Sequence, residues 1–179
     1  MVSQSPDLIK GYRNAVLTPN VNEFAKLAER VLSKQRDEDE EDEEQKSGRE
    51  LRELCAELGY VTIVRKGQRD IVSDGKELLV CDQQASLRRQ GGQGDLLTGL
   101  LATFLHWQNS NDHHHTGNTD SSKSSAPVSR VQAAWAACLL LRACSRSAFE
   151  KHARATSTPA IISEIGPVFA KYFEQPDDR

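Results

Sequence analysis

The chain has 179 residues, long enough for one domain with a buried core, and 37% of them are hydrophobic. Its formal net charge is −3, of which eight consecutive acids, Asp37–Glu44, carry −8, so the rest of the chain is mildly basic at +5. This balance predicts neither a nucleic-acid-binding nor a membrane protein, since no apolar run reaches the roughly 18 residues that a membrane-spanning helix needs.

The first part of the chain predicts a strand, a helix and a charged insertion. Ala15–Thr18 is rich in β-forming residues and is followed by Pro19, which ends a strand. Asn22–Leu32 has apolar residues at helical spacing. Residues 35–47 predict an acidic, disordered insertion, because a run of like charges repels itself and stays solvated. A plain loop is the main interpretation, and binding of a basic partner is the alternative.

A second helix, a buried strand and a hairpin follow. Ser47–Leu58 predicts a helix that Gly59 ends. Tyr60–Val64 is almost continuously apolar, as in a strand buried on both faces of a parallel sheet. Arg69–Cys81 holds an Asp74-Gly75 pair between two apolar runs, which predicts a β-hairpin with a type I′ turn.

A long helix and a polar loop come next. The helix begins at a glycine-rich stretch and runs to about Gln108. Residues 109–127 are rich in Ser, Asn and His and predict a flexible loop. The adjacent histidines 113–115 invite a metal site, but they lack its spacing and its supporting shell, so adventitious metal affinity is the favoured interpretation.

Two more helices end the chain. Arg130–Glu150 is apolar nearly all round in its first half and is expected to be buried. Thr158 and Pro159 predict the cap and first turn of a last helix at about Ala160–Phe173. The order of helices and strands predicts a single α/β domain over residues 1–179, in which helices flank a mostly parallel sheet that includes a β-hairpin.

Cysteine usage bears on the compartment. No two cysteines have C-x-x-C spacing, so they predict small buried hydrophobes in a reducing compartment. We expect a soluble, cytoplasmic protein, with the mitochondrion as the alternative. The four are Cys55, Cys81, Cys138 and Cys144.

The most informative stretch is Gly91–Gly99, GGQGDLLTG. Three glycines feed a helix N-terminus, where bare amides and the positive end of the helix dipole suit a phosphate. A carboxylate at this place repels phosphate, so Asp95 is better suited to take a proton from a group that attacks the phosphate. The alternative, equally weighted from this motif alone, is that Asp95 is only the helix N-cap.

Polar side chains also follow the two predicted parallel strands. Asn20 and Glu23 come after the first strand, where ligands bind in open α/β sheets, although the pair also fits a capping box. Lys66 and Arg69 come after the second strand, and Arg88 and Arg89 precede the glycine loop. Four such cations at one sheet edge predict a polyphosphate site, and ordinary basic surface residues are the alternative.

A family resemblance rests on four stretches: AVLTPNVNEF, VRKGQRDIVSDG, GGQGDLLTGLLATFLHW and the tail from AFEKHARATST to EIGPVF. Together they resemble the eukaryotic ATP-dependent (S)-NAD(P)H-hydrate dehydratases of the ribokinase-like superfamily. The K-G-x-x-D and L-T-P-N-x-x-E-F elements separate the chain from generic sugar kinases, which share only the G-x-G-D element.

The resemblance implies a three-layer ribokinase-like fold and a repair reaction. ATP and Mg²⁺ would be used to dehydrate hydrated NADH or NADPH, releasing ADP, phosphate and the restored nucleotide. The implied partners are this small-molecule substrate, an NAD(P)H-hydrate epimerase and a possible second copy of the chain, and the metal ligands stay unassigned. The residues implied for the hydrate pocket are Asn20, Val21, Asn22, Glu23, Phe24, Ala25, Lys26 and Asp95, with Asp95 also the catalytic base. Those implied for ATP are Lys66, Gly67, Gln68, Arg69, Asp70, Ala85, Ser86, Leu87, Arg88, Arg89, Gln90, Gly91, Gly92, Gln93 and Gly94.

The same resemblance implies that the chain corresponds to the C-terminal portion of the family's fold and lacks an N-terminal half with further strands and part of the hydrate pocket. The alternative function is therefore an inactive truncated fragment that binds nucleotide or assembles with a partner. Because a sheet edge and an apolar face would be left in water, we expect the 179-residue chain alone to be oligomeric, partly molten or insoluble, with negligible dehydratase activity.

Overall fold

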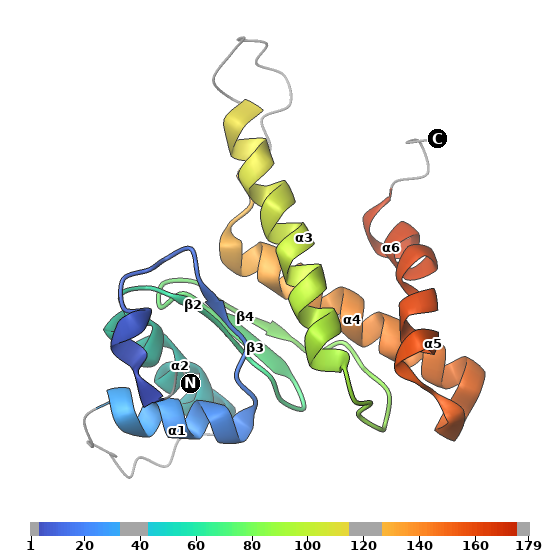
Figure 1. The fold of residues 1–179 in the computed structure, drawn as a ribbon, viewed down its shortest axis with the longest axis horizontal. Coiled ribbons are helices and arrows are strands. Elements are labelled where there is room, and N and C mark those ends of the chain that lie inside the picture. Colours follow the sequence, from blue (N-terminus) through green and yellow to red (C-terminus); the bar gives the residue numbers. More distant parts are fainter. Residues whose placement is uncertain (1–3, 33–42, 115–126, 175–179) are drawn as a thin grey trace. The chain divides into compact units, whose positions relative to one another are not determined.

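A computed structural model describes residues 4–32, 43–114 and 127–174 of the chain. These residues fall into two compact units, an N-terminal unit of residues 1–82 and a C-terminal unit of residues 83–179 (Figure 1). Residues 35–42 of the acidic segment and residues 115–126 of the histidine-rich segment, which include His115, lie outside the described residues. The expectation of one domain over the whole chain stays a prediction.

Four strands form the sheet of the N-terminal unit, in the order β1-β2-β3-β4 (Figure 1). β1 and β2 are parallel, whereas β2, β3 and β4 pair antiparallel. The α/β class is confirmed, but the prediction of a mostly parallel sheet is wrong for these strands. Short turns join β2 to β3 and β3 to β4, and a short turn allows only antiparallel pairing. The strands are β1 (Val16–Leu17), β2 (Thr62–Arg65), β3 (Asp70–Ser73) and β4 (Leu78–Cys81).

The hairpin of β3 and β4 is confirmed, but its turn is not of type I′. Ser73 pairs with Leu78, which leaves four residues in the turn. Type I′ needs positive φ at both central residues, and here Gly75 has φ +94° while Asp74 is not among the positive-φ residues. The Asp74 carboxylate instead accepts hydrogen bonds from the amides of Lys76 and Glu77, both at 2.9 Å. An aspartate side chain that folds back onto its own turn thus replaces the tighter geometry.

Two helices cover one face of the sheet. α1 (Val21–Val31) begins with the capping box predicted for Asn20 and Glu23. α2 (Glu43–Glu57) begins four residues before the predicted Ser47, inside the segment assigned to the acidic insertion, because glutamate and glutamine are good helix formers. Gly59 ends the helix region as predicted, with φ +77°.

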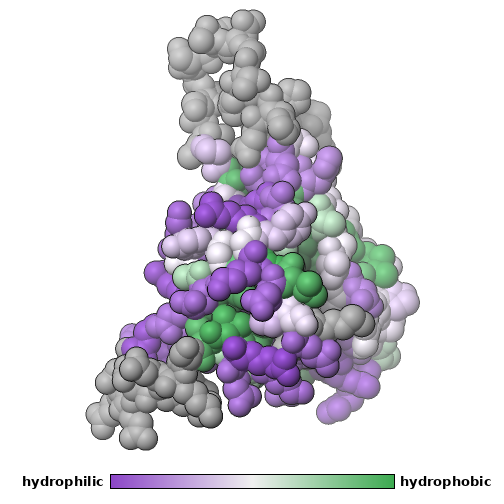
Figure 2. All heavy atoms as spheres, turned by 60° about the vertical axis from the view of Figure 1, so that its left-hand side comes forward, coloured by the Kyte–Doolittle hydropathy of each residue, from purple (hydrophilic) through white to green (hydrophobic). Residues whose placement is uncertain are grey.

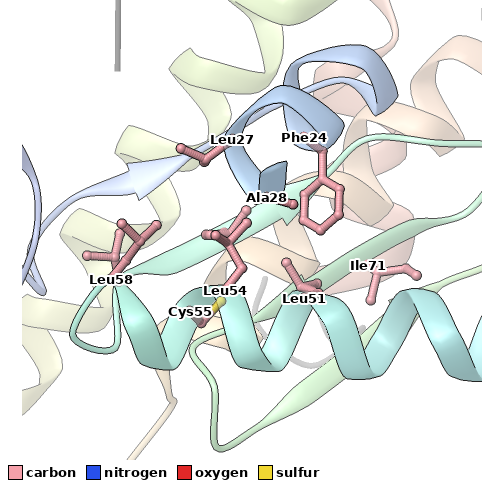
Figure 3. Packing of buried hydrophobic residues seen from close by; sticks show 10 residues of the cluster. Phe24, Leu27, Ala28, Leu51, Leu54, Cys55, Leu58 and Ile71 are labelled. Atoms are coloured by element: carbon pink, nitrogen blue, oxygen red, sulfur yellow. The ribbon is translucent and has the colours of Figure 1, made fainter. Parts of the chain in front are cut away.

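The core of the N-terminal unit forms where α1 and α2 meet the sheet (Figure 3). The apolar residues at helical spacing in α1, and those of α2, face this core, and the strand residues Val61–Val64 are buried. The buried residues of this cluster are Phe24, Leu27, Ala28, Leu51, Leu54, Cys55, Leu58, Val61, Ile63 and Ile71.

Helices make up the described part of the C-terminal unit, and α3 and α4 lie side by side in it (Figure 1). α3 continues six residues beyond the predicted end at Gln108, so the start of the predicted polar loop is wrong. The predicted last helix is two helices, broken at Glu164, because Pro167 lacks an amide hydrogen and is tolerated only in a first turn. The elements are α3 (Gln93–His114), α4 (Arg130–His152), a 3₁₀ turn (Ala153–Ala155), α5 (Thr158–Ser163) and α6 (Ile165–Phe173).

α4 supplies much of the core of this unit, as its apolar sequence predicted. Leu140, Cys144 and Ala148 of α4 pack with Ile161 of α5 and Val168 of α6. Aromatic rings add to this core on the side of α3 and α6, with centroids 5.1 to 6.3 Å apart. These rings belong to Phe104, Trp107, Phe169 and Phe173.

Hydrophilic residues cover most of the face shown in Figure 2, with hydrophobic residues exposed between them. The large hydrophobic side chains that are exposed include Leu87, at 87%, and Trp107, at 46%. In the part of the chain that the structure describes, no helix is both long and apolar enough to cross a membrane.

Glu164 joins α4 to the break between α5 and α6. Glu164 is 5% exposed, and its carboxylate accepts hydrogen bonds from the Lys151 ammonium at 2.7 and 2.8 Å and from the Ser147 hydroxyl at 2.7 Å. The hydrogen bonds from Lys151 and then from Ser147 lower the pKa of Glu164. These contacts therefore favour the charged carboxylate in the folded state.

We expect Glu164→Gln to lower the free energy of unfolding of the C-terminal unit by about 1–2 kcal/mol at neutral pH. Because the folded-state pKa is lowered, this contribution is present above the unfolded value of about 4.3 and is lost as the pH falls through the folded value. Urea unfolding followed by tryptophan fluorescence checks this, since both tryptophans, Trp107 and Trp135, lie in this unit. An equal difference between the two proteins at pH 7 and at pH 2.5 would contradict the ionic contribution.

All four cysteines are buried and free, as the sequence predicted. Burial, and then the charge of Asp74, raises the pKa of the Cys55 thiol to about 12. Burial, and then the charge of Glu164, raises the pKa of Cys144 to about 12. Both thiols are therefore protonated and inert in the folded protein.

The stability contributed by these two thiols is present below the unfolded pKa of about 8.5 and is lost as the pH rises toward the folded value. We expect the loss to reach about 1.4 kcal/mol per pH unit for each thiol in that window. Urea unfolding at pH 7.5, 9.5 and 10.5 checks this against the double variant Cys55→Ala, Cys144→Ala, whose pH dependence should be flatter. Parallel pH profiles for the two proteins would rule the linkage out.

Candidate functional site

The glycine loop, residues 91–94, leads directly into α3 in the C-terminal unit. Gly92 has φ +84°, which favours glycine, and its carbonyl accepts hydrogen bonds from the amides of Asp95 and Leu96, both at 3.1 Å. Cβ atoms built on Gly91 and Gly94 would meet nothing within 4 Å. The loop thus presents open backbone beside the first turn of a long helix, which is the geometry of an anion site.

Asp95 lies in the first turn of α3 and is exposed. It is not the helix N-cap, because the first i to i+4 hydrogen bond of the helix ends on the carbonyl of Gly92. The interpretation of Asp95 as an N-cap is therefore wrong. A carboxylate in this position is stabilised by the helix dipole and is open to a ligand. Its role as a base stays a prediction.

The segment before the loop is partly anchored and partly exposed. Arg142 of α4 donates a hydrogen bond from Nε to the carbonyl of Gln83. Ala85, Ser86 and Gln90 are half-buried. Leu87, Arg88 and Arg89 are exposed.

In the N-terminal unit, the segments after β1 and β2 meet at one edge of the sheet. The amide of Lys66 donates to the carbonyl of Pro19 at 2.9 Å, beyond the last parallel pair of β1 and β2, Leu17 with Ile63. This hydrogen bond brings the start of α1 beside the turn formed by residues 66–70, as the carboxyl ends of parallel strands require. Two of the predicted site segments are therefore neighbours.

The turn of residues 66–70 is held by its own aspartate. Asp70 is 8% exposed, and its Oδ1 accepts a hydrogen bond from the amide of Gly67 at 3.0 Å. Lys66 and Gly67 are half-buried, whereas Gln68 and Arg69 are exposed. The K-G-x-x-D pattern thus encodes a turn that is held by its own aspartate.

The predicted hydrate-binding residues divide by exposure. Asn20 and Glu23 form the capping box through bonds of 2.7 and 2.9 Å. Phe24 is 2% exposed and belongs to the core. The Arg65 guanidinium lies 5.1 Å from the centroid of the Phe24 ring, a contact that the sequence did not reveal. Val21, Asn22, Ala25 and Lys26 are exposed.

The four predicted phosphate-binding cations are divided between the two units, two in each. Lys66 and Arg69 belong to the N-terminal unit, and Arg88 and Arg89 to the C-terminal unit. Across residues 4–32, 43–114 and 127–174, no group of three or more His, Cys, Asp or Glu side chains could hold a metal ion.

Sequence reasoning missed the residues of α4 and α5 that contact the glycine loop. Ser145 of α4 accepts a hydrogen bond from Gln93, and Thr158 of α5 donates one to the carbonyl of Gly91. No local signal marked Ser145, since Arg142, Arg146 and Ser147 are also polar residues in the same stretch of sequence. Thr158 was predicted as a cap, but Ser157 is the N-cap residue of α5.

A family model described as NAD(P)H-hydrate dehydratase matches residues 1–167 of the chain. The chain is 45% identical over 174 residues to the ATP-dependent (S)-NAD(P)H-hydrate dehydratase of Homo sapiens, covering 97% of the chain and 46% of that protein. It is 44% identical over 174 residues to the protein of the same name from Bos taurus, covering 97% of the chain and 49% of that protein. The chain thus spans about half the length of the curated relatives it matches.

Two solved structures share the fold. The structure of hydroxyethylthiazole kinase from Pyrococcus horikoshii OT3 aligns with 86% of the chain and over 48% of its own length, with a TM-score of 0.57 and 17% sequence identity. Bacillus subtilis YxkO matches 87% of the chain and 48% of its own length, with a TM-score of 0.58 and 20% identity. At these identities the likeness establishes the fold alone.

Proposed function

Because the chain belongs to the NAD(P)H-hydrate dehydratase family, we propose that its protein uses ATP to dehydrate (S)-NADHX and (S)-NADPHX, the hydrated forms of NADH and NADPH. The products are NADH or NADPH, ADP and phosphate. The enzyme is therefore an ATP-dependent hydro-lyase that repairs nicotinamide nucleotides. Relatives that carry this name match the chain over about half their length.

One observation carries the proposal. The open glycine loop ends in the first turn of α3, and the exposed carboxylate of Asp95 lies in that turn. Amides at a helix N-terminus stabilise charge on a transferred phosphoryl group, and a neighbouring carboxylate can accept a proton. Phosphoryl transfer from ATP to a hydroxyl uses both.

The proposed residue roles follow the two units. We assign residues 66–70 and residues 85–94 to ATP binding, with basic side chains on the phosphates. We assign residues 20–26 to the hydrate, where the exposed side chains would contact it and Phe24 would support the segment from the core.

The proposed reaction has two steps. Asp95 accepts the proton of the hydroxyl on carbon 6 of the nicotinamide ring while that oxygen attacks the γ-phosphorus and the bond to the ADP oxygen breaks. Backbone amides of residues 92–94 stabilise the charge on the phosphoryl oxygens. The ring nitrogen lone pair then expels phosphate, a better leaving group than hydroxide, and loss of a ring proton restores the reduced nicotinamide.

Magnesium is part of the proposal. Mg²⁺ usually binds through substrate phosphates and one or two carboxylates while keeping several waters, so it needs no cage of protein ligands. The described residues fit such an ion, because the glycine loop adjoins the exposed carboxylate of Asp95. When bound with ATP, the ion supplies neutralising charge to the phosphates.

The partners and compartment are also proposals. We propose that an epimerase supplies the S form of the hydrate, since a stereospecific enzyme would otherwise leave the other epimer unrepaired. A homo-oligomer is proposed as well. Four buried free cysteines favour a reducing compartment, so we propose the cytoplasm, with the mitochondrion as the alternative.

The direct test is recovery of reduced nicotinamide absorbance when the protein is incubated with purified (S)-NADHX, ATP and Mg²⁺. Recovery that requires ATP, with release of one phosphate for each NADH, supports the proposal. A non-hydrolysable ATP analogue is the control and should give none. Tight ATP binding without recovery would favour the alternative of a nucleotide-binding fragment, and consumption of ATP with a sugar or vitamin substrate instead would reject the dehydratase.

A further inference from the structure

A buried hydroxyl on α4 ties both ends of the glycine-loop region together. Ser145 is 2% exposed. Its Oγ accepts a hydrogen bond from Gln93 Nε2 at 3.1 Å and donates one to Ser86 Oγ at 2.9 Å. The Ser86 hydroxyl donates in turn to the carbonyl of Arg88. The hydroxyls of Ser145 and Ser86 each donate one hydrogen bond and accept one. One directional network of hydrogen bonds therefore links Ser86 and Arg88 to Gln93 through Ser145.

Thr158 of α5 contacts the same loop at Gly91 and Gly92. Its hydroxyl donates to the carbonyl of Gly91. A Cβ built on Gly92 would lie 3.4 Å from the Thr158 methyl carbon, so this methyl group packs against the backbone at Gly92. Gly92 has the positive φ that turns the chain into α3. The hydroxyl of Thr158 therefore anchors the turn, and its methyl group lies beside the turn.

These contacts leave the ligand side of the loop open. Cβ atoms built on Gly91 and Gly94 would meet nothing within 4 Å, and Asp95 is exposed. Ser145 and Thr158 touch the loop through Gln93, Gly91 and Gly92 and not through Gly94 or Asp95. The loop is thus fixed without any of these side chains occupying the place where a phosphate would bind.

We propose that Ser145 and Thr158 are positioning residues that hold the glycine loop in the shape needed for phosphoryl transfer. The inference rests on the proposed function, because it assigns the loop to the phosphates of ATP. Amides that are aimed in advance stabilise developing charge without reorganising. A displacement of about 1 Å in such a group can cost about 10²-fold in rate, so contacts behind the loop matter although they touch no substrate.

The test compares four variants of the full chain. Thr158→Val removes the hydroxyl and keeps the shape, whereas Thr158→Ser keeps the hydroxyl and serves as the rescue. Ser145→Ala removes the α4 contact. Thr103→Val is the matched control, because the Thr103 hydroxyl bonds only within α3, to the carbonyl of Gly99 at 3.1 Å.

Two measurements do not depend on turnover. The first is hydrogen exchange at the amides of Asp95 and Leu96, which bond to Gly92. The second is the affinity for ATP. A third measurement, kcat for the hydrate, is made where the protein turns over. We expect Thr158→Val and Ser145→Ala to speed exchange at these amides about tenfold, weaken ATP binding about tenfold and lower kcat by about 10²-fold. Thr158→Ser and Thr103→Val should stay within about threefold of the unmodified chain in all three.

Exchange rates and ATP affinities of Thr158→Val and Ser145→Ala that match Thr103→Val would overturn the inference. Should Ser145→Ala fail to fold, the Thr158→Val and Thr158→Ser pair decides it alone. Failure of the proposed function looks different: the unmodified chain would bind ATP without dehydrating the hydrate, and exchange and affinity would still report on the loop. If the unmodified chain binds no ATP, the inference is overturned as well.

Discussion

We expect Asp95→Asn to lower the turnover of the NAD(P)H hydrate by at least about 10²-fold, because an amide cannot accept the proton of the attacking hydroxyl. The affinity for ATP and the free energy of unfolding should change little, since Asp95 is exposed and the side chain keeps its size. Steady-state recovery of NADH from (S)-NADHX, in a chain extended at its N-terminus to the length of its relatives, checks the loss of turnover, and the affinity for ATP is measured on the same preparation.

The matched control for this change is Asp7→Asn. Asp7 is also exposed, lies in the N-terminal 3₁₀ turn (Pro6–Leu8) and carries no proposed role. It should leave turnover unchanged. Near-normal turnover in Asp95→Asn would remove Asp95 as the base and would leave its carboxylate with a helix-dipole role only.

Local features of the fold could be predicted from the sequence, and the direction of the strands could not. The capping box of Asn20 and Glu23, the stop at Gly59 and the hairpin around Asp74 all depend on residues within a few positions of one another. The antiparallel pairing of β2 with β3 depends on the short turn at residues 66–69, which was interpreted as a strand end and not as a hairpin. A continuous apolar run fits a buried strand whether its neighbour is parallel or antiparallel. Burial alone therefore could not predict the direction of pairing.

The candidate site shows the same division. The glycine loop and Asp95 were found because glycine, the loop amides and the helix N-terminus are adjacent in sequence. The contacts of Ser145 with Gln93 and of Thr158 with Gly91 span 52 and 67 residues, and no local pattern encodes them. From its neighbours in sequence, Thr158 was predicted as a helix cap. In the structure its hydroxyl donates a hydrogen bond to the carbonyl of Gly91 in the glycine loop.

We expect Gly59→Ala to be the most destabilising glycine replacement in the N-terminal unit, with a loss of about 2–4 kcal/mol. Gly59 has φ +77°, a left-handed conformation that alone costs alanine about 1–2 kcal/mol. An added Cβ would also lie 2.7 Å from both N and Cα of Gly11, and these are backbone atoms that cannot rotate away. Moving them would strain the hydrogen bond of 2.8 Å from the Gly11 amide to the carbonyl of Leu58.

Two other glycines separate the backbone strain from the clash. Gly11 also has φ +77°, but an added Cβ would meet nothing within 4 Å, so Gly11→Ala should cost only about 1–2 kcal/mol. Gly48 lies in α2 with an added Cβ 3.4 Å from a Leu78 methyl carbon, and Gly48→Ala should be neutral or gain up to about 1 kcal/mol from helix propensity. Far-UV circular dichroism during urea unfolding measures all three, with tryptophan fluorescence as the internal control because both tryptophans lie in the C-terminal unit. If Gly59→Ala cost no more than Gly11→Ala, the contact between the end of α2 and the turn at Gly11 would contribute nothing beyond the conformation of Gly59 itself.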